Sequence, residues 1–156
     1  LKINKKVEYA MMVLKYMEDF QGNSRNISAR EICTTFKAPF DTIAKVMQTL
    51  AGANILQSIK GINGGYLLIA NLNQISYLQL VELIEGKIPT NFCEGNAGTR
   101  SLVNTCNIVH PVQQLNQKMT QFLTTLSLKE ILSEGLVRPF KVEEAENTLC
   151  REKDRH

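Results

Sequence analysis

The stretch from residue 28 to residue 69 constrains the fold more than any other part of the sequence. Ser28 has the pattern of a helix start, because Glu31 follows three residues later and apolar residues flank the cap. The helix is predicted to be short, since Pro39 disfavours helical backbone at the residue before it. A second helix then begins at about Asp41. Two short helices joined by so tight a turn are typical of a helix-turn-helix unit.

The second helix and the residues after it extend this pattern. The apolar positions of the helix share one face and comprise Phe40, Ile43, Val46, Met47 and Leu50. We expect Gly52 to end the helix in a left-handed conformation. Two β-rich runs, 55–59 and 66–69, flank a glycine-containing segment and predict a hairpin. Helix, turn, helix and hairpin in this order are the layout of a winged helix-turn-helix domain, so the fold class is predicted to be mainly α with a small β-hairpin wing.

Three more helices are predicted outside this region, besides a long C-terminal helix. The first is indicated by apolar residues at spacings of three and four, and we expect it to end near Gly22. Its apolar face comprises Ile3, Val7, Met11, Leu14 and Met17. Ser76 and Ser127 repeat the capping pattern, each with Gln or Glu three residues later, and each predicts a helix start.

A long C-terminal helix is predicted to open at Pro111, because proline favours the first helical turn. Its apolar residues form a narrow seam of about two heptads, namely Val112, Leu115, Met119, Phe122 and Leu126. Such a seam suits a partner helix, for which a second copy of the chain is the simplest source. Ordinary packing against the core of the same chain is the alternative.

Length and composition favour one domain with an extension. The chain has 156 residues, of which 44% are hydrophobic. We predict a winged-helix domain over 1–86, a polar loop over 87–110, the long helix and a following short helix over 111–135, and a polar tail over 136–156. No apolar run is long enough to cross a bilayer, and the N-terminal residues do not form a secretory signal, so we expect a cytoplasmic protein without membrane contact.

Positive charge is concentrated in the first half of the chain. Residues 1–70 carry nine Lys/Arg against five Asp/Glu, whereas the remainder carries nine against ten. A basic half favours a polyanionic partner, and the second helix of a winged helix enters the DNA major groove. The candidate DNA contacts are therefore Thr42, Lys45 and Gln48 on that helix, Lys60 at the hairpin, and Lys5 and Lys6 near the N-terminus. The alternative is a solvated surface used for protein contacts.

The polar loop holds two of the four cysteines, Cys93 and Cys106, and His110 follows the second by four residues. This spacing is not that of a zinc finger, although thiolate and imidazole groups do bind zinc or iron. The alternative is that Cys93 and Cys106 are ordinary thiols that bind no metal. Cys33 lies beside Ile32 on an apolar helix face and is predicted to be a buried structural thiol.

Catalytic motifs are weak throughout the sequence. It has no nucleophile elbow, phosphate loop or HExxH motif, and its two histidines are few for acid-base chemistry. Glu82 and Glu85 share a helix face, which solvation explains. A thiol-based enzyme that uses Cys93 and Cys106 would need a second catalytic group that the sequence does not show. We therefore expect a protein that is not an enzyme.

Four segments together resemble the Rrf2 superfamily of bacterial winged-helix transcription regulators, which includes the IscR and NsrR iron-sulfur regulators. The segments are Val7-Glu8-Tyr9-Ala10, Gly64-Gly65-Tyr66-Leu67-Leu68, the stretch 75–86 and the stretch 126–131, so that the similarity runs from about residue 1 to residue 135. The resemblance implies a homodimer that reads a pseudo-palindromic operator. It places Thr42 and Lys45 at base-reading positions and Lys60 where the wing usually has arginine.

The resemblance also implies an iron-sulfur cluster at the dimer interface that senses redox state, nitric oxide or cluster status. Cys93 matches the first of the family's three loop cysteines and Cys106 the last, whereas the middle cysteine is absent. His110 and Glu8, the latter from the partner subunit, match positions of the remaining ligands. Two cysteines favour a 2Fe-2S cluster over a 4Fe-4S cluster. A cluster-free regulator that responds to a metabolite or a partner protein is the alternative.

Overall fold

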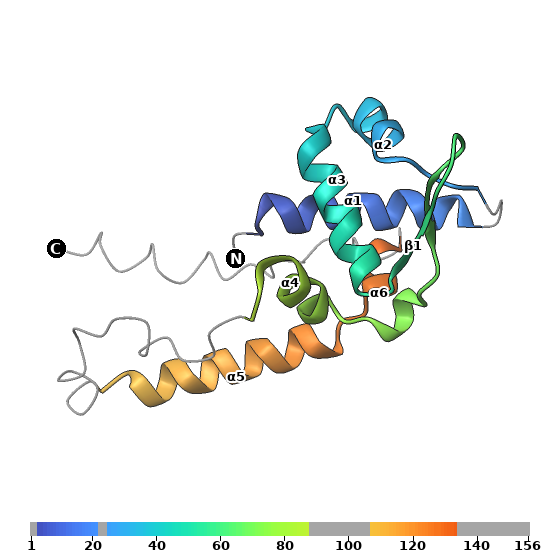
Figure 1. The fold of residues 1–156 in the computed structure, drawn as a ribbon. Coiled ribbons are helices and arrows are strands. Elements are labelled where there is room, and N and C mark those ends of the chain that lie inside the picture. The colour runs from blue at the N-terminus through green and yellow to red at the C-terminus, as the bar shows by residue number, and fades with distance from the viewer. Residues whose placement is uncertain (1–2, 22–24, 88–106, 134–156) are drawn as a thin grey trace, which may run out of the picture.

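The fold is a helical body with a two-stranded wing and one long helix along its side (Figure 1). The computed structural model describes residues 3–21, 25–87 and 107–133. Its elements in chain order are α1 (Lys5–Asp19), α2 (Ala29–Phe36), α3 (Phe40–Gly52), β1 (Leu56–Ile59), β2 (Gly65–Leu68), a 3-10 turn (Leu72–Gln74), α4 (Tyr77–Glu85), α5 (Val109–Thr125) and α6 (Leu128–Leu132). The predicted winged helix-turn-helix fold is confirmed.

The core lies where α1 packs against α3 and α4. The fully buried side chains include Leu14 of α1, Met47 and Leu50 of α3, and Leu80 of α4. The apolar face of α1 differs from the predicted one at its start, because Ile3 precedes the helix and is 37% exposed. Ala10 and Val13 occupy the buried face instead.

The helix-turn-helix unit forms at the predicted residues. The Ser28 side chain accepts a hydrogen bond from the Glu31 backbone N–H at 3.2 Å, which caps α2. The Glu31 carboxylate accepts a hydrogen bond from the Tyr16 hydroxyl at 2.9 Å and pairs with Arg25, so it ties α1 to α2. At the end of α2, Lys37 takes a left-handed conformation with φ of 52°. This residue makes the tight turn into α3.

The left-handed residue after α3 is not the predicted Gly52. Gly52 is the last helical residue and has no positive φ. The left-handed residue is Asn54, with φ of 57°, and the N–H of Ile55 returns to the Leu50 carbonyl at 3.0 Å. Among residue types, asparagine is second only to glycine in tolerating the left-handed conformation. The left-handed position therefore lies at Asn54, two residues after the predicted Gly52.

The wing is an antiparallel hairpin in which Leu56 pairs with Leu68 and Ile59 with Gly65. A third segment joins it, because the backbones of Ile27 and Tyr66 exchange hydrogen bonds of 3.0 and 2.9 Å. Gly65 is required at this contact, since a Cβ there would lie 2.8 Å from the Ile27 carbonyl oxygen. The wing is thereby fastened to the helix-turn-helix unit.

The chain returns to the body after α5. The Tyr77 N–H donates to the Leu126 carbonyl and the Leu128 N–H donates to the Ile75 carbonyl, both at 2.8 Å. An ion pair of 2.6 Å between Lys129 of α6 and Glu18 of α1 lies beside this junction. Ser76 and Ser127 cap α4 and α6 as predicted.

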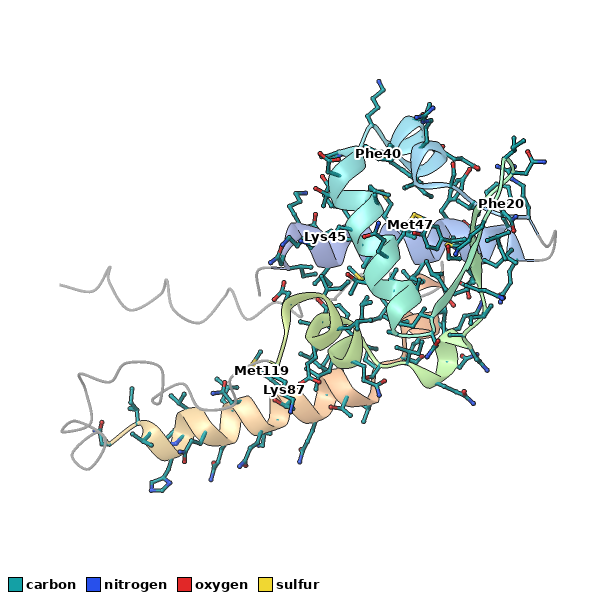
Figure 2. The ribbon with its side chains drawn as sticks, in the orientation of Figure 1. Phe20, Phe40, Lys45, Met47, Lys87 and Met119 are labelled. Atoms are coloured by element: carbon teal, nitrogen blue, oxygen red, sulfur yellow. The ribbon has the colours of Figure 1, made fainter. Side chains whose placement is uncertain are left out.

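Helix α5 begins at Val109, two residues before the predicted start at Pro111. Proline still lies within the first turn, where its missing N–H leaves no helical hydrogen bond unmade. One side of α5 packs against α4. An adjoining side is apolar and partly exposed, with Leu115 57%, Met119 41% and Phe122 62% exposed. Figure 2 labels Met119 on this helix. Within the part of the chain that the structure describes, no helix is long and apolar enough to span a membrane.

Candidate nucleic-acid interface

Helix α3 presents a polar face to solvent, while its apolar face is buried in the core except at its first residue, Phe40, which is 51% exposed. Ile43, Met47 and Leu50 are fully buried, whereas Lys45 and Gln48 are exposed. Thr42 is half-buried at the flank. The three predicted contact residues of this helix therefore all lie at or beside its outer face, where Figure 2 labels Lys45.

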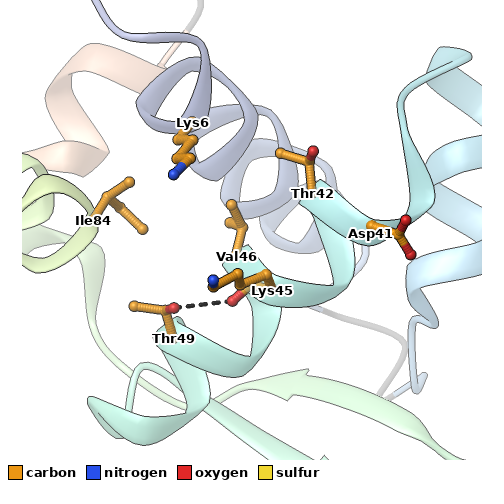
Figure 3. A pocket seen from close by; sticks show the side chains of 7 residues that line it. All are labelled: Lys6, Asp41, Thr42, Lys45, Val46, Thr49 and Ile84. Carbon is orange, nitrogen blue, oxygen red and sulfur yellow. Dashed lines mark hydrogen bonds between the residues drawn. The ribbon is translucent and has the colours of Figure 1, made fainter.

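A hollow of about 230 Å³ lies beside α3, between the start of α1 and the end of α4. It is lined by Lys6, Asp41, Thr42, Lys45, Val46, Thr49 and Ile84 (Figure 3). The Thr49 hydroxyl donates to the Lys45 carbonyl at 2.9 Å, so its proton is used within the helix. Among the described residues, neither Lys6 nor Lys45 forms an ion pair through its ammonium group. Two lysines from separate helices thus line one largely apolar hollow, together with Asp41 at the start of α3.

The two neighbouring lysines of α1 differ in their surroundings. The Lys5 ammonium lies 2.6 Å from the Glu8 carboxylate, and this hydrogen bond, with the charge of Glu8, raises the pKa of Lys5. Both side chains are well exposed, so the pair contributes little to stability. Glu8 nevertheless offsets much of the local charge of Lys5. Lys6, which lines the hollow, carries the less compensated charge.

Negative charge is absent from α3 beyond its first turn and from the wing. No Asp or Glu occurs between Asp41 and Glu82, and the basic residues of this stretch are Lys45 and Lys60. Lys60 is exposed at the end of β1, at the base of the wing tip. Apart from Asp41 in the first turn of α3, this surface therefore carries cations without competing carboxylates, which attracts a polyanion.

Lys5 and Lys6 are both predicted to contact the DNA backbone. In the structure, only Lys6 of the two lines the hollow with Lys45. The acid-free stretch after Asp41 was visible in the sequence and is the signal that could have defined this surface.

Two of the four predicted metal ligands lie in the described part of the chain. His110 is exposed as the second residue of α5, and Glu8 lies on α1 beside Lys5. Cys93 and Cys106 lie outside the described residues. The described portion alone contains no cluster of three potential metal-ligating side chains. Cys33 is half-buried against the core rather than fully buried as predicted, and burial raises the pKa of its thiol.

Fold and charge define the class of protein as a winged-helix DNA-binding domain with an additional long helix. The family model of Rrf2, described as an iron-dependent transcriptional regulator, matches residues 3–134. The chain therefore belongs to the Rrf2 family of transcriptional regulators, in agreement with the sequence-based resemblance.

Individual relatives are distant in sequence but similar in fold. A protein of Aquifex aeolicus described as an HTH-type transcriptional regulator is 24% identical over 129 residues, which cover 81% of this chain and 88% of the relative. The structure of CymR, the global cysteine regulator of B. subtilis, matches with a TM-score of 0.64 and 18% identity, over 85% of this chain and 96% of that one. T. potens IscR matches with a TM-score of 0.61 and 17% identity, over 85% and 86%.

Proposed function

We propose that this protein is a homodimeric regulator that binds a pseudo-palindromic DNA operator through α3 and the wing. The observation that carries the proposal is the surface around the hollow, where Lys6 and Lys45 converge on the outer side of α3 and no acidic residue follows Asp41 until α4. A helix with a buried apolar face and an exposed polar face is the geometry that major-groove recognition requires.

Each contact residue has a role that follows from its place. Thr42, Lys45 and Gln48 face the major groove, where hydroxyl, ammonium and amide groups hydrogen-bond to base edges or phosphates. Lys6 approaches the DNA backbone beside α3, and Lys5 adds charge nearby. Lys60 reaches a phosphate or the minor groove from the wing. Phosphate contacts fix the position of the domain, and base contacts select the sequence.

The exposed side of α5 supports dimerisation. Leu115, Met119 and Phe122 form an apolar stripe that no described residue of the same chain covers. A two-fold pair of such helices would bury both stripes and would hold two copies of α3 for two half-sites.

DNA binding is tested by affinity as a function of salt, with a duplex that the full-length protein selects from a random pool. We expect Lys45→Ala to weaken binding about tenfold or more and to reduce the salt slope by about one. Lys6→Ala should do the same, whereas Lys5→Ala is the matched control and should have the smaller effect, because Glu8 already compensates Lys5. Affinity and slope that stay unchanged in both Lys6→Ala and Lys45→Ala would contradict this interface.

We further propose that the dimer senses redox state, nitric oxide or iron-sulfur status through a cluster, with 2Fe-2S favoured over 4Fe-4S. Cys93, Cys106 and His110 of one chain and Glu8 of the other would hold it. In support, His110 is exposed, and among the described residues Glu8 forms an exposed ion pair with Lys5, which ligand exchange would break at small cost. Thiolate and imidazole are established cluster ligands, and a bound cluster would supply a redox-sensitive link between the subunits.

Protein purified without oxygen tests the cluster through its iron, acid-labile sulfide and visible spectrum. We expect Cys106→Ala to lose most of the iron and sulfide, whereas Cys33→Ala, the control at a half-buried structural thiol, should retain them. A parent protein that is colourless and resists reconstitution, yet binds DNA, would instead establish a cluster-free regulator that responds to a metabolite or a partner protein.

A further inference from the structure

The tip of the wing carries an apolar side chain in full contact with solvent. Ile62 is 105% exposed, more than any other large apolar side chain of the described residues. Ile69, at the other end of the hairpin, is 53% exposed. An isoleucine side chain that packs against none of the described residues adds no burial energy to the fold, so a role for it would lie outside the monomer.

The backbone around Ile62 is closely constrained. The Gly64 N–H donates to the Gly61 carbonyl at 3.0 Å, which closes a four-residue turn with Ile62 and Asn63 at its centre. A Cβ at Gly64 would lie 2.6 Å from the Ile59 carbonyl oxygen, so the turn accepts only glycine there.

The segment that precedes α2 also holds this turn. The Asn26 side-chain amide donates to the Asn63 carbonyl at 3.1 Å, from the segment that precedes α2. Isoleucine itself is stiff at χ1 because it is β-branched. The turn therefore presents a rigid apolar wedge with little conformational entropy left to lose on binding.

The charge around the tip indicates what the wedge meets. Lys60 precedes Ile62 by two residues, and the wing contains no carboxylate. This setting favours a polyanion such as DNA, whose less polar surfaces are the base faces and the sugars rather than the phosphates or the hydrogen-bonding base edges. Apolar side chains that enter the DNA minor groove insert between base steps and partly unstack them.

We propose that Ile62 is a minor-groove wedge, which enters a base step beside the half-site read by α3 while Lys60 contacts a flanking phosphate. This inference rests on the proposed DNA-binding function and adds a contact to it. Unstacking is least costly at flexible pyrimidine–purine steps, so the wedge would select such steps without a hydrogen bond to any base. It would also bend the duplex away from the inserted side chain.

The test compares Ile62→Ala with Ile62→Val, which keeps a β-branched apolar tip, and with Ile69→Ala, the same truncation elsewhere on the hairpin. The full-length dimer and its selected duplex are used, with affinity, donor–acceptor energy transfer between the DNA ends, and 2-aminopurine fluorescence at the contacted step as readouts. Since Ile62 is fully exposed, none of the tip variants should alter the unfolding temperature, which a thermal scan checks.

We expect Ile62→Ala to weaken binding about tenfold, to reduce the bend and to abolish the 2-aminopurine signal. Ile62→Val and Ile69→Ala should stay within about twofold of the parent. Parental affinity and bend in Ile62→Ala would overturn the wedge, as would weaker binding without any change in bend or fluorescence, which indicates a plain surface contact.

The two proposals fail in different ways. If Lys45→Ala weakens binding while Ile62→Ala does not, the wedge is wrong and the DNA-binding function stands. If the parent shows no salt-dependent DNA affinity, both are wrong, and capture of a protein partner that is lost in Ile62→Ala would assign the tip to protein recognition instead.

Discussion

Helices α3 and α5 are both amphipathic, but within the described residues α3 buries most of its apolar face, whereas α5 leaves much of its apolar stripe exposed. Met47 and Leu50 of α3 are fully buried against α1 and the start of the wing. In α5, Val109 is the buried residue, and the stripe through Leu115 and Phe122 remains more than half exposed. Figure 1 shows the same contrast, with α3 lying across the body and α5 running along its side.

The comparison shows that two helices with similar amphipathic patterns can pack differently, one mainly against its own chain and one with its apolar side left open. The face of α3 stabilises the fold of one chain, so its polar side is free for recognition. The apolar stripe of α5 is 41–62% exposed among the described residues, so it contributes less to the folded monomer and offers apolar surface to a second chain. Substitutions on the two helices should therefore separate folding from association.

The largest expected effect is on folding. Leu50→Ala removes a fully buried side chain and should lower the free energy of unfolding by about 3 kcal/mol. Leu115→Ala, the same truncation on α5, should lower it by less than about 0.5 kcal/mol at a concentration where the chain is monomeric. Urea denaturation followed by circular dichroism measures both. Equal losses would show that the stripe of α5 is buried in the monomer.

The next effect is on association. Phe122→Glu places a charge within the apolar stripe and should raise the dimer dissociation constant about hundredfold, because a carboxylate is costly to bury unpaired. Gln121→Glu is the matched control, since it adds the same charge at an exposed neighbouring position. Sedimentation equilibrium measures both variants. A dimer that tolerates Phe122→Glu as well as Gln121→Glu would exclude this stripe as the interface.

The smallest effect concerns the turn that leads into α3. Lys37 has φ of 52°, so Lys37→Gly should stabilise the body by about 0.5–1 kcal/mol, since glycine has no steric penalty there. Asn54→Gly, at the other left-handed residue, should gain less because asparagine tolerates this conformation. Thermal unfolding distinguishes the two, and the dimer dissociation constant should not change. A loss of stability in Lys37→Gly would show that the lysine side chain makes a compensating contact.

The local elements could be predicted because their signals are local. Ser28, Ser76 and Ser127 cap helices as predicted, and Pro39 follows the turn between α2 and α3. Strand ends and the start of α5 were displaced by one or two residues, since several neighbouring positions satisfy the same helix or strand geometry.

The candidate site was predicted only in part. The outward placement of Lys45 and Gln48 follows from helical periodicity, so the sequence sufficed. The cluster ligands Cys93 and Cys106 stay a prediction. The carboxylate of Glu31 was expected to complete the cap of α2, but it binds Tyr16 and Arg25, because side chains of α1 and of the preceding loop are brought within its reach.

The sequence by itself determined the order of helices, the turn, the wing and the concentration of positive charge, because caps, prolines, periodicity and composition act over a few neighbouring residues. Only the tertiary structure decided that Lys6 and Lys45 line one hollow, that Gly65 lies against Ile27, and that the described residues leave the stripe of α5 largely exposed. Those contacts depend on how segments far apart in the chain pack around one core, and no local pattern encodes that packing.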